Sequence, residues 1–458
     1  MLNNAMSDRK LILVIGGTGA QGSSVVRALS DSGRYNVRVL TRNAQSDHAS
    51  RLAELPNVTL VQGSQDSQKD LHTAFMGVYG AWVNLDGFIL GEKNELFYGI
   101  RAYEIARHHG VKHYIFANTD YALRKANWDE QYHWGHNDAK GRVADLILSH
   151  GQSGMKTSIL TTGPYMDMLL DGMFVPQQQS DGSFVWENPA ADGKIPLIAL
   201  DDVGVYSLWI FDNPSQSAGL DLEVATDQVS FADIAATFTK VTGKKGIHRR
   251  VPLEDYLVKA APYPGASANW AADPNEPRDE SFMTWSDNFR AWWRYWSEGK
   301  GATRDMAFLD SIHSTRIPNL ETWMRIKNYD GLPRPTARET AQQCLDTLIA
   351  TATRSHRVDD DAIERLVHNV NELAFCETLR QYVLTNVDIE ACRERIKRME
   401  ANLVRHDADK EVAQIYAQED VLISAIEMVA KVGKEGVITL KERSPNFFEA
   451  LENKVQQS

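Results

Sequence analysis

The sequence lacks any apolar run of the roughly 18 to 20 residues that a membrane-spanning helix needs, and it has only three cysteines among 458 residues. So few cysteines exclude a disulfide-bonded scaffold and are typical of a reducing compartment. The net charge of −12 argues against a general nucleic-acid binder, because attraction to phosphates needs a basic face. The first ten residues are polar and do not resemble a secretory signal. We therefore expect a cytoplasmic protein, with the nucleus as a further location, and neither a membrane nor a direct nucleic-acid partner.

Composition divides the chain near residue 331. All eleven tryptophans lie at or before Trp323, whereas the three cysteines, Cys344, Cys376 and Cys392, all follow it. The segment 330–335 between them has the glycine and prolines of a linker. We expect an NAD(P)-binding domain over 1–331, with a Rossmann core at about 9–165 and a smaller α/β substrate lobe at about 166–331. A mostly helical extension over 336–458 follows, and its charged, periodic sequence predicts an interaction module.

Short apolar strands alternate with helices up to residue 165. Strands are predicted at Lys10–Ile15, Asn36–Leu40, Val58–Gln62, Gly80–Leu85, His113–Asn118 and Lys156–Thr161, and helices at Ser23–Leu29, Leu96–His109 and Gly141–Ser149. This alternation predicts an α/β fold with a doubly wound parallel sheet covered by helices on both faces. Farther along, the aromatic stretch Trp285–Trp296 has helical spacing. There we expect a helix docked on the core, with an aromatic substrate wall as the alternative.

A glycine-rich turn, Gly16-Gly17-Thr18-Gly19-Ala20-Gln21-Gly22, joins the first strand to the first helix. Small residues here permit a tight turn, close approach of the backbone to a pyrophosphate, and packing of helix on strand. The phosphates then lie at the positive end of the helix. At the end of the second strand, where an acidic residue would bind the ribose of NAD, the chain has Arg42, whose guanidinium suits a 2′-phosphate. These features predict NADP(H) as the cofactor.

A series of motifs resembles those of the NmrA-like family, an atypical branch of the short-chain dehydrogenase/reductases. The glycine turn lies in GGTGAQGSSVVRAL, and VRVLTRN and VTLVQGSQDS follow it. Further matches, in the family's order, are VKHYIFAN, HNDAKGRVADLIL, TSILTTGPYMDML and IPLIALDDVGVYSLWIF. The resemblance spans about residues 9–330, and its N-terminal part is especially similar to the NADPH-sensor members of animals. It implies a Rossmann-type fold that holds NADP(H).

The resemblance also implies which residues hold the cofactor. The turn would contact the pyrophosphate, and Arg42 and Asn43 would face the 2′-phosphate. Lys140 would bond the nicotinamide ribose, and Tyr165 would border the nicotinamide. The full implied set is Gly16, Gly17, Thr18, Gly19, Ala20, Gln21, Gly22, Arg42, Asn43, Ser64, Gln65, Asp86, Gly87, Lys140, Tyr165, Met166, Asp167 and Met168. Two departures, Ser64 in place of an acidic residue and Phe97 in place of a lysine, weaken the expected adenine contact and one phosphate contact.

His136 and Lys140 are the candidate catalytic residues. Ordinary short-chain dehydrogenases use Tyr-x-x-x-Lys, in which the lysine lowers the tyrosine pKa and the tyrosine moves the proton. Here histidine takes the tyrosine position, and the four-residue spacing puts both side chains on one helical face. Three interpretations stay open. His136 acts as the acid; or Lys140 acts alone, as in the isoflavone-reductase-like relatives; or Lys140 only holds the ribose.

The remaining polar clusters predict no metal site. His108, His109 and His113 flank a helix end, where a favourable terminal charge is expected, and His133 lacks a convincing ligand set with His136. In the extension, residues 408–442 resemble a fragment of the group I chaperonins (the Hsp60 type). That fragment is too short for chaperonin activity, and we carry none over.

Two functions compete. An NADPH-dependent oxidoreductase, which reduces a carbonyl or a conjugated double bond of a small organic metabolite, is favoured by the intact turn, by Lys140 and by Trp128, Trp134 and Trp186 as a surface for a flat substrate. A non-catalytic NADP(H)-ratio sensor, which regulates transcription or signalling through a protein partner, is favoured by the missing tyrosine. We take the oxidoreductase as the first hypothesis. Homodimer formation, and an interaction protein dominated by its tail, stay open.

Overall fold

The computed structural model describes residues 9–261, 267–268, 281–301 and 303–334. The chain divides into two compact units, residues 1–167 with 176–331 and residues 168–175 with 332–458. The fold and the sites below belong to the first unit. The predicted helical extension over 336–458 and its chaperonin-like segment lie outside the described residues.

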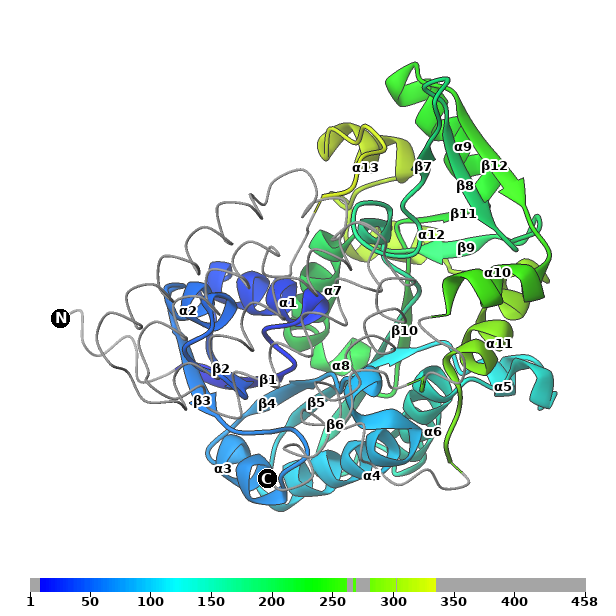
Figure 1. The fold of residues 1–458 in the computed structure, drawn as a ribbon. Coiled ribbons are helices and arrows are strands. Elements are labelled where there is room, and N and C mark those ends of the chain that lie inside the picture. The colour runs from blue at the N-terminus through cyan, green and yellow to red at the C-terminus, as the bar shows by residue number, and fades with distance from the viewer. Residues whose placement is uncertain (1–8, 262–266, 269–280, 302, 335–458) are drawn as a thin grey trace, which may run out of the picture. The chain divides into compact units, whose positions relative to one another are not determined.

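Seven parallel strands form the central sheet (Figure 1). Their order is β3 (Val58–Gln62), β2 (Tyr35–Thr41), β1 (Lys10–Ile15), β4 (Gly80–Val83), β5 (His113–Thr119), β6 (Lys156–Thr162) and β10 (Asp221–Val224). Helices cover both faces, which is why strands such as β1 are nearly continuous apolar runs. The chain reverses its direction of travel across the sheet between β1 and β4, and in open α/β sheets ligands bind beyond the carboxyl ends of the strands at this position.

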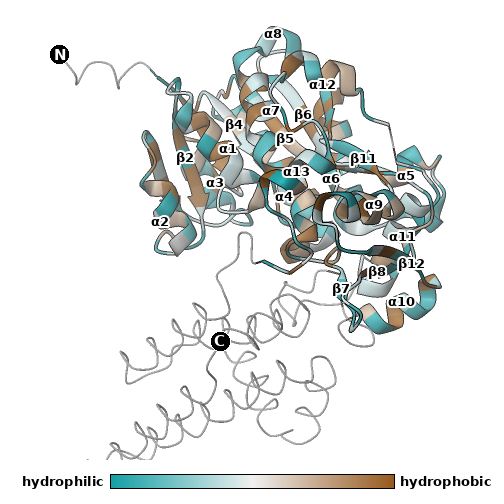
Figure 2. Ribbon diagram, turned by 90° about the horizontal axis from the view of Figure 1, so that it is seen from above, coloured by the Kyte–Doolittle hydropathy of each residue, from teal (hydrophilic) through white to brown (hydrophobic). Residues whose placement is uncertain are grey.

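Two groups of helices cover the sheet, one on each face (Figure 1). One face carries α1 (Ala20–Asp31), α2 (Asp47–Ala53) and α7 (Leu200–Asp212), and the other carries α3 (Gln68–Phe75), α4 (Gly87–His108) and α6 (Gly135–Ser149). These helices carry both hydrophobic and hydrophilic residues, as amphipathic helices do (Figure 2). The short helices α5 (Ala122–Lys125) and α8 (Pro214–Ser217) complete this part.

The second lobe is built from two small sheets and several helices. In one sheet β8 (Phe184–Asn188) pairs with β12 (Gly246–Arg250) and β7 (Gln177–Gln178), and in the other β9 (Ile195–Leu197) pairs with β11 (Asp227–Val229). Its helices are α9 (Phe231–Thr242), α10 (Leu253–Ala260), α11 (Trp285–Ser297), α12 (Met306–Ile312) and α13 (Leu320–Ile326). A capping box between Ser230 and Asp233 starts α9, and Gly243, with a φ of +72°, ends it. A smaller α/β lobe is thus present, but β10 and α7, which the prediction placed in it, belong to the central sheet and its helix layer.

The predicted doubly wound sheet is confirmed, and all six predicted strands lie in it. The seventh strand, β10, was not predicted, and the helices differ at their starts. The helix expected at Leu96–His109 begins at Gly87, because Asp86 caps it with a side-chain oxygen that accepts a hydrogen bond from Phe88 N. The docked helix expected in the aromatic stretch is α11, whose six large aromatic side chains are each at most 8% exposed. Among the residues that the structure describes, no helix combines the length and hydrophobicity needed to span a bilayer.

Candidate functional site

The glycine turn is packed so closely that three of its four glycines, Gly16, Gly17 and Gly22, leave no room for a Cβ. Gly16 has a φ of +79°, and a Cβ there would lie 2.6 Å from the carbonyl oxygen of Asn84, which follows β4. A Cβ on Gly22 would lie 2.1 Å from the oxygen of Gly16. Gly19 precedes α1 and no side chain caps that helix. The turn therefore presents an uncapped helix start at the junction of β1 and β4, which is the arrangement that binds a diphosphate.

Arg42 follows the strand next to this turn. Its position is set by register, because Ile15 pairs with both Leu40 of β2 and Val83 of β4, so all three strands end at one level. Arg42 is exposed and forms no hydrogen bond or ion pair with the residues that the structure describes. The neighbouring Asn43 uses its side-chain oxygen in a local turn, accepting from Gln45 N at 2.9 Å. An unpaired guanidinium at this edge is available to an anionic ligand.

Ser64 lies beyond β3, and the carboxylates near it are already engaged. Its backbone N–H donates to Asp70 at 3.0 Å, and its hydroxyl donates to Asp66. Ser64 and Gln65 are both half-buried. Acidic side chains are thus present near Ser64, but Asp66 and Asp70 are hydrogen-bonded to Ser64 itself and stabilise the loop.

Lys140 lies on α6 with its ammonium group buried beside the loop that follows β4. Its Nζ donates to Asn84 Oδ1 at 3.0 Å and to the oxygen of Leu85 at 2.7 Å, and it lies 2.8 Å from Glu95 Oε1. An ammonium has three N–H donors, so all three have an acceptor within the protein. Because the backbone oxygen of Asn84 lies close to Gly16, Lys140 holds the loop that packs against the glycine turn.

Glu95 is the functional residue that sequence reasoning missed. It projects from α4, is fully buried, and forms an ion pair with Lys140. Burial raises the pKa of its carboxyl to about 7, although the charge of Lys140 opposes the rise. The sequence did contain a sign of its burial. Glu95 precedes Gly99 by four residues and Ala102 by seven, and this spacing places it on the buried face of the helix. A charged residue in an apolar stripe indicates a buried partner.

Gln21 and Tyr165, both predicted to lie near the cofactor, contact each other. Gln21 Nε2 donates to the hydroxyl of Tyr165 at 2.8 Å and to Thr162 Oγ1 at 3.1 Å, so it ties the glycine turn to the end of β6. Burial raises the pKa of Tyr165. The three residues after Tyr165 were also predicted to lie near the cofactor. Met166 is fully buried, and Asp167 is buried with a carboxylate oxygen 3.4 Å from Leu200 N at the start of α7. Met168 belongs to the second unit.

His136 does not share its hydrogen bonds with Lys140. Its Nδ1 lies 3.0 Å from Asn288 Oδ1 on α11, and its ring lies 4.7 Å from that of Phe88 and 6.0 Å from that of Phe289. Burial lowers the pKa of His136 to about 4; its bond to Asn288 opposes this, and the charge of Lys140 adds to it. At neutral pH His136 is uncharged, so it is a poor acid. Together with Phe88 and Phe289 it forms an aromatic surface.

The exposed Asp86 and the buried Gly87 lie at the start of α4. The charge of Asp86 contributes to the raised pKa of both Glu95 and Tyr165, so the carboxylate lies near both. A Cβ on Gly87 would lie 2.4 Å from Glu95 Oε2. The structure therefore brings the glycine turn, Asp86, Lys140 and Tyr165 to one edge of the sheet.

Residues 8–269 match the model of the NmrA-like family. The chain belongs to the NmrA-like family. It is 31% identical over 253 residues to the NmrA-like family domain-containing oxidoreductase lnaB of Aspergillus flavus, an alignment that covers 52% of this chain and 75% of that protein. Residues after 269 lie outside the family match.

Two solved structures show the same fold at low sequence identity. A complex of NmrA, a negative transcriptional regulator, with NADP has a TM-score of 0.53 and 19% identity, and it covers 70% of this chain and 98% of that one. The NADPH complex of the quinone oxidoreductase QOR2 from Escherichia coli has a TM-score of 0.53 and 18% identity, and it covers 69% of this chain and 99% of that one. These similarities establish the Rossmann-type NmrA fold of this chain.

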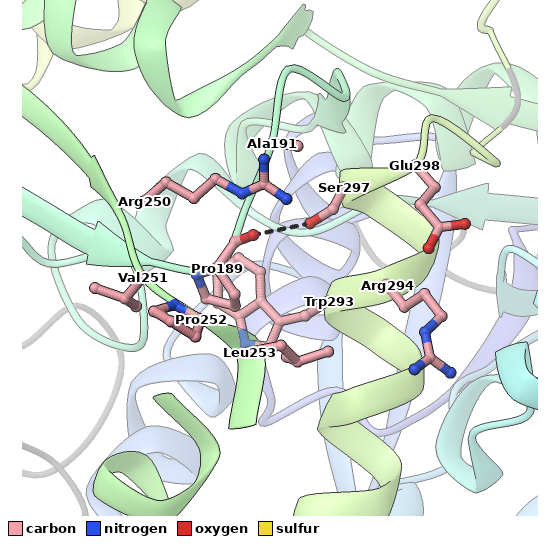
Figure 3. Close-up of a pocket in the computed structure, with 10 residues that line it drawn as sticks. All are labelled: Pro189, Ala191, Arg250, Val251, Pro252, Leu253, Trp293, Arg294, Ser297 and Glu298. Atoms are coloured by element: carbon pink, nitrogen blue, oxygen red, sulfur yellow. Dashed lines mark hydrogen bonds between the residues drawn. The ribbon is translucent and has the colours of Figure 1, made fainter. Parts of the chain in front are cut away.

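The tryptophans that were expected to offer a flat surface in this NmrA-like chain are mostly core residues. Trp134 and Trp186 are at most 2% exposed, whereas Trp128 is 60% exposed. A cavity of about 450 Å³ does open in the second lobe, where Trp293, Arg294 and Ser297 of α11 face residues that follow β12 (Figure 3). Its lining is Pro189, Ala191, Arg250, Val251, Pro252, Leu253, Trp293, Arg294, Ser297 and Glu298. None of these is a predicted cofactor or catalytic residue.

Proposed function

We propose that this NmrA-like chain binds NADP(H) and uses it to reduce a carbonyl or conjugated double bond of a small organic molecule. One observation carries the proposal. The ammonium of Lys140 is anchored to the loop after β4, the same loop that the glycine turn touches through Gly16 and Asn84. A fixed cation therefore lies beside a glycine turn with the features of a dinucleotide site.

The residues at this edge of the sheet fit the cofactor. The uncapped start of α1 receives the pyrophosphate, because its N–H groups have no side-chain partner. The unpaired guanidinium of Arg42 receives the 2′-phosphate. Asp86, Gly87 and Tyr165 border the nicotinamide end. The bound cofactor supplies a hydride, and the protein supplies position, electrostatics and protons.

The substrate is bound between Lys140 and the aromatic surface of Phe88, His136 and Phe289. These rings favour a flat, conjugated molecule and exclude water from the reacting atom. Nζ of Lys140 exchanges its bond to Asn84 Oδ1, the longest of its contacts, for an oxygen of the ligand. The ammonium of Lys140 then gives a proton to the oxygen of the substrate as that oxygen is reduced. Glu95 Oε1 lies 2.8 Å from Nζ and, when protonated, can give Lys140 a new proton.

A second function, a sensor of the NADP(H) ratio without turnover, is favoured by the state of the same residues. All three donors of Lys140 already have acceptors, and His136 is uncharged where ordinary relatives have a tyrosine. The similarity to NmrA, itself a negative transcriptional regulator, supports this alternative. A sensor would act through a regulatory protein or a second copy of the chain.

We also propose the domain boundary near residue 331, the interaction role of 336–458 and a cytoplasmic or nuclear location.

Oxidation of NADPH by the full chain, measured with a panel of quinones, ketones and enals, tests the proposal. We expect turnover with at least one class, and a loss of about 100-fold or more in Lys140→Met, because proton transfer contributes about that much or more. Lys112→Met is the control, since Lys112 is exposed and precedes β5 at the opposite edge of the sheet. If calorimetry shows NADPH binding while the wild type oxidises NADPH no faster than Lys140→Met, the sensor function replaces the reductase.

A further inference from the structure

Three histidines from two helices converge at the edge of the sheet opposite the glycine turn. His72 lies in the last turn of α3, His108 ends α4, and His109 caps it. One ring nitrogen from each lies within 4.8 Å of the other two. The sequence groups His108 and His109 with His113. In the structure His113 is not part of the cluster, because it is fully buried in the sheet, where its Nε2 lies 3.3 Å from Ser158 Oγ.

The geometry of the cluster is close to that of a set of metal ligands. His72 Nδ1 and His109 Nε2 lie 3.1 Å apart. Two nitrogens bound to one tetrahedral Zn²⁺ at about 2.0–2.1 Å are separated by roughly 3.3 Å. The three rings lie 5.0 to 5.5 Å apart between centroids and are steeply inclined to one another, so their nitrogens meet from different directions. Only small rotations of exposed or half-buried side chains are needed to complete the set.

The electrostatics favour one shared cation over separate protons. The carboxyl ends of α3 and α4 meet here, and the negative ends of both helix dipoles attract positive charge. Three protonated imidazoles would repel one another, whereas neutral imidazoles are the form that ligates metals. One divalent ion satisfies all three rings at once.

We propose that His72, His108 and His109 bind a single divalent transition-metal ion of the zinc class, with water at the fourth position. The chemistry of the donor set selects the ion, because neutral imidazoles suit zinc and copper and do not suit magnesium or calcium. The ion joins the ends of α3 and α4 and so stabilises this face of the sheet. The site is remote from the glycine turn and independent of the proposed reductase activity.

Calorimetric titration of the tag-free, chelator-treated full chain with Zn²⁺ tests the site. We expect His72→Gln and His108→Gln each to lose one equivalent, or to bind it at least about tenfold more weakly, because even the loss of an outer-shell partner costs 10- to 100-fold. His108 is exposed, so its replacement leaves the fold intact. His150→Gln, an exposed histidine after α6, is the matched control and should bind Zn²⁺ as the wild type does.

Cobalt(II) separates this site from ligation by cysteine. Bound Co²⁺ should show ligand-field bands that disappear in His72→Gln, with no thiolate charge-transfer band from Cys344, Cys376 or Cys392. Zn²⁺ should also raise the unfolding temperature of the wild type and of His150→Gln but not that of His108→Gln. Equal Zn²⁺ binding by the wild type and both cluster variants would overturn the proposal.

Discussion

Nζ of Lys140 lies 2.8 Å from a carboxylate oxygen of Glu95, and both groups are buried behind the loop that packs against the glycine turn. The pair is unusual because the carboxyl keeps a raised pKa of about 7 even next to an ammonium. Its ionisation therefore changes near neutral pH, which is where a group that exchanges protons during catalysis is most effective. The pH dependence of the protein should report on this single carboxyl.

Replacing Glu95 by Gln should make the free energy of unfolding less dependent on pH. The folded-state pKa of Glu95 lies above the ordinary value of about 4.3, so its contribution to stability is fully present below that value and is lost as the pH rises through 7. Relative to Glu95→Gln, the wild type should lose roughly 3 kcal/mol of unfolding free energy as the pH rises from about 4.5 to 8. Denaturant unfolding at several pH values measures the difference.

The control for Glu95 lies on the same helix. Glu104 is exposed on α4, so Glu104→Gln should leave the pH dependence of the wild type unchanged. The glutamine of Glu95→Gln keeps an oxygen that can accept from Lys140, so the variant should fold. Parallel pH curves for the wild type and Glu95→Gln would show that Glu95 does not titrate in this range.

The sequence predicted six of the seven strands and the glycine turn because both are coded locally. Strands such as β1 and β4 are short apolar runs, and the four glycines of the turn lie within seven consecutive residues. The strand β10, with the sequence DLEV, has no such run and was missed. The start of α4 was missed because Gly91 and the polar residues after it are typical of a loop, and Gly91 indeed has a φ of +70° within the helix. That error removed Glu95 from the expected helix.

The partners within the site could not be read from the sequence because packing, not spacing, determines them. Gln21 and Tyr165 are hydrogen-bonded across 144 residues. His136 and Lys140 are spaced to share one helical face, yet α11 and α4 supply closer partners for each. Only the folded chain reveals that Asn288, rather than Lys140, bonds the ring of His136.

Arg42→Ala should weaken NADPH binding by about 10- to 100-fold, the cost of losing a charge-assisted hydrogen bond, and should leave NADH binding unchanged. The reason is that the guanidinium is unpaired within the described residues and lies at the end of β2, where the 2′-phosphate is expected. Calorimetry with both nucleotides measures the two affinities. Arg51→Ala, an exposed arginine in the last turn of α2, is the matched control. An unaltered preference for NADPH in Arg42→Ala would refute the role of this residue.

His136→Asn should lower the rate of NADPH oxidation by less than about tenfold, whereas removal of a general acid costs about 100-fold or more. The pKa of His136 is lowered to about 4, so the ring is already uncharged throughout the range in which the enzyme would be assayed. The rate–pH profiles of the wild type and the variant should therefore have the same shape between pH 6 and 8. A loss above 100-fold, with an inflection near pH 6.5 that is absent from the variant, would identify His136 as the acid.

Arg304 and Asp120 form the buried ion pair on which the stability of the first unit should depend most. Two hydrogen bonds of 3.0 and 3.1 Å join them, and their side chains are 0% and 1% exposed. Arg304→Met leaves the carboxylate of Asp120 with only the ammonium of Lys125, and breaking such a pair should cost about 3–5 kcal/mol of unfolding free energy.

The matched control for Arg304 is Arg325, whose exposed pair with Glu321 lies on the surface of α13. Arg325→Met should cost less than about 0.5 kcal/mol, because water screens an exposed pair. Burial alone would raise the pKa of Asp120, but Arg304 and Lys125 hold it below its ordinary value. The contribution of Asp120 to the unfolding free energy is therefore present above the ordinary pKa of an aspartate and is lost as the pH falls below that value. Acid should therefore destabilise the wild type more than Asp120→Asn. Guanidinium unfolding followed by tryptophan fluorescence measures both effects, and equal losses in Arg304→Met and Arg325→Met would contradict the assignment.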